Sequence, residues 1–248
     1  MYLKEIYTDS NPETLHAFIR QHPLGVLTTA IPSATHPLLQ STHLPWLLDV
    51  DTTTTTTATD NSSSSSAPKP KLRGHIAKSN PQCQAILSSL PPTSPSPPTL
   101  PTQILILFTS PHHSYITPRF YTTTAPTTGK VAPTWNYAAV QVYGRATIYD
   151  SSCDATSAFL DTQLRDLALH CERTLMNHDG QNGRPEPWTL DDAPEGYIRA
   201  LKRNIVGIEV EVERMEGKFK MSQERGEGDR EGVECRALHI NRQDGRAV

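Results

Sequence analysis

The stretch Val206-Gly207-Ile208-Glu209-Val210-Glu211-Val212-Glu213 is the most regular pattern in this chain. Apolar residues at positions 206, 208, 210 and 212 alternate with glycine and glutamate. An extended backbone places alternate side chains on opposite faces, so the pattern gives one buried face and one solvated face. It predicts a half-buried β-strand, as found in antiparallel sheets.

Further strands and helices are expected on both sides of this segment. Strands are predicted from enrichment in β-branched and apolar residues, over 24–30, 41–49, 72–77, 104–108 and 135–149. Ser10 with Pro12 and Glu13 indicates one helix start, and Asn80 with Pro81 indicates another. Helices are also expected over 151–171, where leucines recur at intervals of three and four, and over 194–204. The chain is predicted to be α+β and mainly β.

Two biased tracts interrupt this pattern. Residues 51–70 contain runs of threonine and serine, and residues 91–102 are rich in proline. Such tracts have too few apolar groups to offset the entropy lost on ordering. We expect both to be low-complexity loop insertions in a single domain covering 1–248.

Composition excludes several classes of protein. The formal net charge of -3 provides no general attraction for nucleic acid, and no helix-turn-helix with a basic recognition helix is found, so direct nucleic-acid binding is not expected. No apolar run approaches the roughly 20 residues that cross a membrane, and no secretory signal is recognised, so a cytoplasmic protein is expected. The cysteines at 83, 153, 171 and 235 form no C-x-x-C pair. We expect reduced packing thiols and no metal site.

Residues 73–80 carry the clearest candidate for ligand binding. Arg73 and His75 lie on a predicted strand that leads into Lys78, Ser79 and the helix beginning after Asn80. Guanidinium, ammonium and hydroxyl groups, together with the free N–H groups of a helix start, are the donors that bind phosphate. The spacing matches no Walker or Rossmann glycine motif. A solvated strand end with an ordinary helix cap is the alternative interpretation.

Three other segments could complete such a site. Residues 111–121 mix histidine and tyrosine rings with hydroxyl groups and could line a planar ligand. Trp135, Asn136 and Tyr137 offer a flat apolar face and an amide that could contact a heterocycle, although a core tryptophan is equally expected. Lys218 and Lys220 share one face after an expected turn at Gly217 and could complete an anion site.

Together, Thr42-His43-Leu44-Pro45, Arg73-Gly74-His75, Asn80-Pro81-Gln82, Pro133-Thr134-Trp135-Asn136-Tyr137 and Gly217-Lys218-Phe219-Lys220 resemble the PaiB-type regulators. They occur in the order found in that family, and the resemblance covers nearly the whole chain. The biased tracts are more typical of a eukaryotic homologue.

The resemblance implies an FMN-binding split β-barrel of Greek-key type with peripheral helices, usually a homodimer. It implies that Arg73, His75, Lys78 and Ser79 face the FMN phosphate, that Trp135, Asn136 and Tyr137 approach the ring or the partner subunit, and that Lys218 and Lys220 are secondary contacts. The expected function is binding of FMN or a related phosphorylated flavin, with a redox role such as that of a flavin-dependent oxidoreductase. Two alternatives stay open because fold does not fix function: a ligand-sensing transcriptional regulator without catalytic activity, and a haem-binding protein with His75, His112 or His113 as axial ligand.

Overall fold

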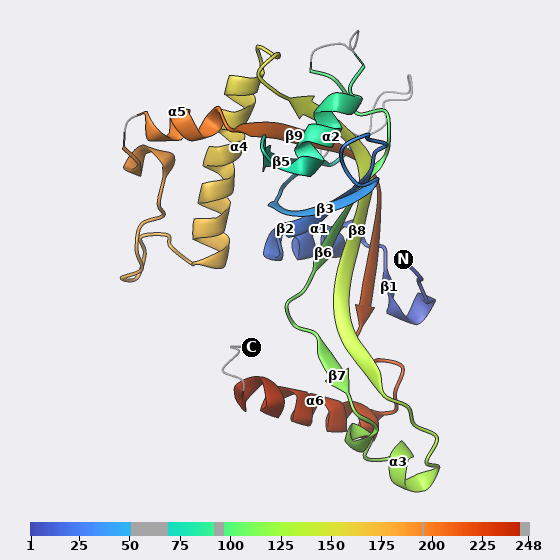
Figure 1. The fold of residues 1–248 in the computed structure, drawn as a ribbon. Helices are drawn as coiled ribbons and strands as arrows, with labels where there is room; N and C mark the ends of the chain where they lie inside the picture. The colour runs from blue at the N-terminus through green and yellow to red at the C-terminus, as the bar shows by residue number, and fades with distance from the viewer. Residues whose placement is uncertain (51–68, 92–96, 195, 244–248) are drawn as a thin grey trace, which may run out of the picture. The chain divides into compact units, whose positions relative to one another are not determined.

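The alternating segment at 206–212 is part of strand β9 (Ile205–Lys220) in the computed structural model of the protein (Figure 1). The structure describes residues 1–50, 69–91, 97–194 and 196–243, and side chains up to residue 235. The first predicted loop insertion lies outside these residues except for 69 and 70, and the second lies outside them at 92–96. The chain divides into two compact units. The first unit is Met1–Leu15, Phe108–Gln141 and Glu216–Val248, and the second is His16–Leu107 and Val142–Met215.

An antiparallel sheet forms the framework of the second unit. Its strand order is β3-β2-β6-β8-β9-β5-β4, in which β6, β8 and β9 contribute the parts that belong to this unit. The remaining strands have these bounds: β2 Leu24–Ala30, β3 Leu39–Pro45, β4 Leu47–Asp49, β5 Lys71–Ala77, β6 Ile104–Thr109 and β8 Thr134–Tyr149. The strand predictions over 24–30, 72–77, 104–108 and 135–149 are therefore confirmed in type and approximate position.

The pairing of β5 with β9 shows how alternation builds the core. Leu72 lies opposite Val210 and Ile76 lies opposite Val206, and all four side chains are buried. Arg73 and His75, which alternate with these residues of β5, point to the other face of the sheet because side chains alternate along a strand. Alternation thus decides which residues of β5 can meet a ligand or a covering helix.

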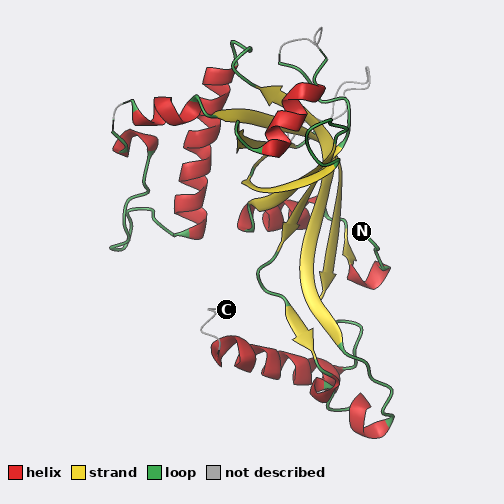
Figure 2. Ribbon diagram, viewed as in Figure 1, coloured by secondary structure: helices red, strands yellow, loops and turns green. Residues whose placement is uncertain are grey.

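Helices lie beside this sheet, as the secondary-structure view shows (Figure 2). Those of the second unit are α2 Pro81–Ser89, α4 Thr156–His170, its continuation η3 Cys171–Leu175, the short turn η4 Leu190–Asp192, and α5 Tyr197–Lys202. Helix α1, Pro12–Gln21, begins in the first unit and continues into the second. The α+β, mainly β split-barrel class with peripheral helices is confirmed in this antiparallel sheet and its helices.

The first unit has a small core of its own. Ile116, Phe120, Tyr121 and Val233 are buried together. The elements confined to this unit are η1 Glu5–Tyr7, β1 Thr8–Asp9, β7 Ser114–Ile116, η2 Pro118–Phe120, α3 Thr124–Thr127 and α6 Glu227–Gln243. Buried Asp229 of α6 accepts hydrogen bonds from the backbone N–H groups of Thr123 and Thr124 at 2.9 and 3.0 Å. A single carboxylate therefore ties the start of α3 to α6.

Several local expectations were wrong. Asn11 rather than Ser10 caps the first helix, because its Oδ1 accepts the N–H of Glu13 at 2.9 Å. The predicted strand over 41–49 is two strands separated by buried Trp46. Gly217 is not a turn residue but lies inside β9, where a Cβ would be 2.8 Å from the carbonyl oxygen of Asp9 on β1. Glycine is used there because two strands approach closely.

Candidate functional site

The turn between β5 and α2 is built as its sequence predicts. Asn80 caps α2 by accepting the N–H of Gln82 at 2.8 Å, and Pro81 occupies the first turn. The backbone N–H of Lys78 donates to the carbonyl of Asn204 at 2.9 Å, which joins this turn to the segment that precedes β9. Lys78 and Ser79 are thereby fixed at the end of β5.

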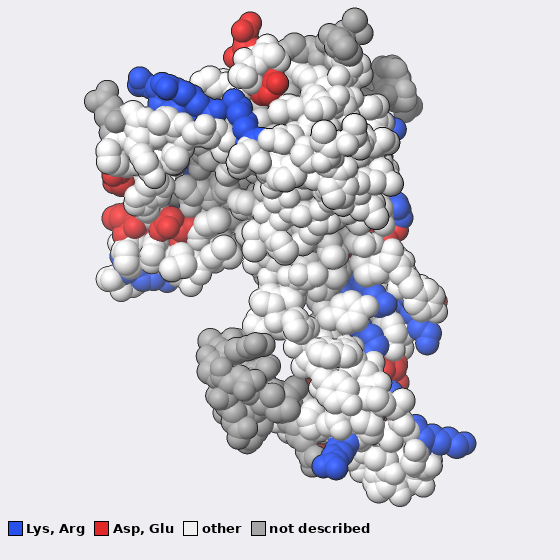
Figure 3. All heavy atoms as spheres, in the orientation of Figure 1, with Lys and Arg blue, Asp and Glu red and all other residues white. Residues whose placement is uncertain are grey.

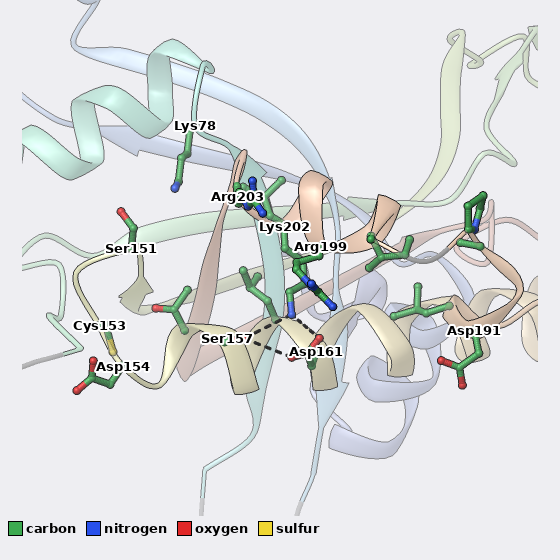
Figure 4. A pocket seen from close by; sticks show the side chains of 18 residues that line it. Lys78, Ser151, Cys153, Asp154, Ser157, Asp161, Asp191, Arg199, Lys202 and Arg203 are labelled. Carbon is green, nitrogen blue, oxygen red and sulfur yellow. Dashed lines mark hydrogen bonds and ion pairs between the residues drawn. The ribbon is translucent and has the colours of Figure 1, made fainter.

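A pocket of about 1130 Å³ opens beside this turn, and we call it the α5 pocket. Leu160, Ser157 and Asp161 line it from α4, since positions three and four apart share one face of a helix. Helix α5 and the residues before β9 close another side. Figure 4 shows Lys78 extending into the pocket from the β5–α2 turn and Arg203 approaching from the end of α5.

Positive charge gathers on one side of the α5 pocket. Lys78, Arg199 and Arg203 line it, and their side chains make no hydrogen bond or ion pair with any described residue. We call these three residues the cationic rim. Figure 3 shows lysine and arginine side chains gathered over α5. Three unpaired cations beside a pocket are the arrangement that binds an anionic group.

A fourth cation, Lys202, is engaged by the protein itself. Its Nζ lies 2.5 Å from Oδ1 of Asp161 and 3.5 Å from Oγ of Ser157, both on α4 (Figure 4). Two further carboxylates, Asp154 and Asp191, line the pocket away from the cationic rim. The unpaired cations of the rim and the carboxylates of Asp154 and Asp191 therefore lie on different sides of the pocket.

Arg73 and His75 are held by helix α4 and do not line the α5 pocket. The Arg73 guanidinium donates to Asp49 and, at 2.9 Å, to Oδ2 of Asp166, and these contacts raise its pKa. The Nδ1 atom of His75 lies 3.0 Å from Oε1 of Gln163, and burial lowers the pKa of this imidazole. Both predicted phosphate ligands therefore have protein partners in this structure.

Ser79 and Trp135 are both exposed. Ser79 is exposed beside Lys78, and its hydroxyl makes no hydrogen bond with a described residue. Trp135, in the first unit, is 54% exposed, with Tyr115 and His113 rings 5.9 and 6.1 Å from its ring. Trp135 is therefore not a core residue.

The other four predicted residues of the first unit form a contiguous cluster. Asn136 is buried and accepts a hydrogen bond from the Ser222 hydroxyl at 3.0 Å. Lys218 donates to the carbonyl of Tyr2 at 2.9 Å, and its ammonium is 5.5 Å from the centroid of the Tyr137 ring.

Lys220 completes this cluster. It donates to the Thr134 hydroxyl at 2.7 Å and to the Trp135 carbonyl at 2.9 Å. Burial lowers the pKa of its ammonium. Both lysines are thus engaged in holding neighbouring segments of the first unit.

The structure therefore brings Trp135, Asn136, Tyr137, Lys218 and Lys220 together within the first unit and places Arg73, His75, Lys78 and Ser79 in the second. Sequence reasoning missed Arg199, Lys202 and Arg203. A signal was present, because spacings of three and four place these cations on one face of the helix predicted over 194–204.

Known proteins and one family match this chain over most of its length. The model of a family described as a putative FMN-binding domain matches residues 1–214. An uncharacterized protein of Aspergillus fumigatus is 51% identical over 239 residues, covering 94% of this chain and 89% of that protein. The protease synthase and sporulation protein PAI 2 of Bacillus subtilis is 23% identical over 229 residues, covering 92% and 85%.

Solved structures give weaker matches. A conserved hypothetical protein from Mycobacterium tuberculosis aligns with a TM-score of 0.47 and 10% identity, over 92% of this chain and 95% of that chain. A pyridoxamine 5'-phosphate oxidase-related, FMN-binding protein from Nostoc punctiforme aligns with a TM-score of 0.38 and 10% identity, over 88% and 86%. Both TM-scores are below 0.5, so these two structures do not indicate where a ligand binds. Support for a site comes from the family match and from the geometry of the α5 pocket.

Proposed function

This chain belongs to the family of putative FMN-binding domains, and from that premise we propose that it binds FMN or a related phosphorylated flavin in the α5 pocket. The observation that carries the proposal is the cationic rim of Lys78, Arg199 and Arg203. The phosphate of FMN is an anion with several acceptor oxygens, and unpaired lysine and arginine side chains are its usual partners.

The pocket also suits the parts of FMN other than its phosphate. Apolar side chains of Leu160, Leu190, Ile198 and Ile205 line it beside the charged groups. Ligand sites are typically apolar with a few polar groups that fix orientation, and their volumes are commonly about 300 to 1,000 Å³. No aromatic side chain of the described residues lines this pocket, so the flavin ring would pack on aliphatic groups.

We propose a redox role for the bound flavin, because FMN supplies hydride and electron chemistry when it is bound. The residues of this chain perform the other tasks. Lys78, Arg199 and Arg203 hold the phosphate, while Leu160, Ile198 and Ile205 exclude water from the ring. Ser157 offers a hydroxyl for the polar chain between phosphate and ring. The homodimer implied by the sequence resemblance stays a prediction.

Titration of purified protein with FMN and with riboflavin, which lacks the phosphate, tests the proposal. We expect FMN to bind more tightly than riboflavin. Lys78→Met and Arg203→Met should each weaken FMN binding by about 10- to 100-fold, as expected for one charge-assisted contact. Lys130→Met is the matched control, since Lys130 is exposed and lies in the first unit.

Three results would overturn the proposal. These are failure to take up FMN at micromolar concentration, equal affinity for FMN and riboflavin, and unchanged FMN affinity in both rim variants. The last result would place the flavin at another site. A Soret band after haem addition, without flavin uptake, would favour the haem alternative instead.

A further inference from the structure

Helix α5 carries much of the cationic rim but is weakly anchored. None of its described residues is buried. Gly196, which precedes the helix, has a φ of +79°, and a Cβ there would contact nothing within 4 Å. At the other end, the carbonyl of Asn204 accepts the backbone N–H of Lys78. The helix therefore has a backbone anchor at its C-terminal end, and its position over the pocket needs another contact.

The contact of Lys202 with α4 supplies this second anchor. Lys202 is the last residue of α5, and its side chain is only 15% exposed where it meets Asp161. Arg199 lies one turn before Lys202, and Arg203 follows it directly. Fixing Lys202 therefore fixes the helix face that presents both arginines to the pocket.

We propose that Asp161 is the positioning residue of the anion site: by pairing with Lys202 it holds α5 so that Arg199 and Arg203 face the phosphate. The inference rests on the proposed function and adds a residue that need not touch the ligand. The carboxylate of Asp161 is 53% exposed, and pairs this exposed contribute little to global stability. A short helix without buried side chains opens at little free-energy cost. The loss of one ion pair therefore removes a larger fraction of the free energy that keeps such a helix closed.

The direction in which FMN affinity changes when Asp161 is removed distinguishes a positioning role from a purely electrostatic one. As a negative charge beside the rim, Asp161 by itself opposes an anion, so its removal would tighten FMN binding. As a positioning residue it preorganises the rim, and its removal would weaken FMN binding. Asp154 provides the comparison, because it is a carboxylate that lines the same pocket without a cation partner among the described residues.

The experiment combines hydrogen exchange of the ligand-free protein with FMN and riboflavin titrations of Asp161→Asn, Asp161→Glu and Asp154→Asn. We expect Asp161→Asn to speed amide exchange over 197–204 and to weaken FMN binding, each by about two- to fivefold. Riboflavin affinity should fall less than FMN affinity, because riboflavin lacks the phosphate that the two arginines face, and Asp161→Glu should restore both exchange and FMN binding. Asp154→Asn should leave exchange unchanged and should not weaken FMN binding.

Two results would overturn this inference. One is unchanged exchange over 197–204 in Asp161→Asn, which needs no ligand to measure. The other is FMN binding by Asp161→Asn that equals or exceeds that of the parent protein. Absence of FMN binding by the parent protein would instead defeat the proposed function, and the exchange data would still decide whether Asp161 positions α5.

Discussion

Gln82 is the side chain whose removal should most clearly perturb the turn that positions Lys78. It is 1% exposed in the first turn of α2. Its Nε2 lies 3.2 Å from the carbonyl oxygen of Leu27, 3.0 Å from Oγ1 of Thr29 and 3.1 Å from the carbonyl oxygen of Gln40. One amide group thereby joins α2 to strands β2 and β3.

The cost of Gln82→Ala follows from these contacts. Two N–H groups supply the three contacts, so about two full hydrogen bonds are lost, at roughly 1 kcal/mol each. The buried carbonyl of Leu27 and the buried hydroxyl of Thr29 lose this donor and a small cavity remains, which brings the expected destabilisation to about 2–4 kcal/mol. Gln84→Ala makes the same substitution in the same helix at an exposed position, and it should change the free energy of unfolding by less than about 0.5 kcal/mol.

Urea unfolding followed by fluorescence of the three tryptophans, of which Trp46 is buried in the same unit, measures this difference. Gln82→Leu keeps most of the side-chain volume while removing the donors, so it separates the hydrogen-bond contribution from the cavity. Equal unfolding midpoints for the Gln82 and Gln84 variants would refute the reasoning.

Two further predictions concern single positions. Asp229→Asn should lower the free energy of unfolding by about 2 kcal/mol near neutral pH, because the hydrogen bonds of Asp229 to Thr123 and Thr124 lose their charged acceptor. The hydrogen bond from the Thr124 side chain, with those from the backbone, lowers the pKa of Asp229 below its ordinary value of 3.8, so the difference should persist above pH 3.8 and shrink as the pH falls below it. Urea unfolding at several pH values checks this, with exposed Glu227→Gln as the control; a difference that does not change with pH would contradict it. Gly144→Ala should destabilise by about 1–3 kcal/mol, since a Cβ would be 2.7 Å from Cγ1 of Val210 and would also contact the Glu211 carbonyl. Gly226→Ala, where a Cβ meets nothing within 4 Å, should unfold at the parent temperature, and equal melting temperatures for the two variants would count against this packing argument.

Local sequence patterns were sufficient to predict most of the strands and the start of α2. Alternation identified the buried face of β9, and the Asn80-Pro81 pair identified a helix cap, because these signals arise from backbone geometry and nearest neighbours. The helix α6 was missed, since Glu227–Gln243 has no strong apolar periodicity, and Val233 is buried there through contacts with residues more than 100 positions away.

The candidate site, too, could be predicted only in part from the sequence. The sequence indicated Lys78, at the end of a strand and before a helix, as a phosphate ligand, and the structure places it in the α5 pocket. It could not show that α4 supplies Asp166 and Gln163 to Arg73 and His75, because those contacts join residues about 90 positions apart. Nor could it show that Arg199 and Arg203 lie beside Lys78 while Lys202 is paired with Asp161. Residue chemistry and spacing determined which groups could bind an anion. Tertiary packing alone decided which of them keep their charge free, because a charge is available to a ligand only where no neighbouring carboxylate has already paired with it.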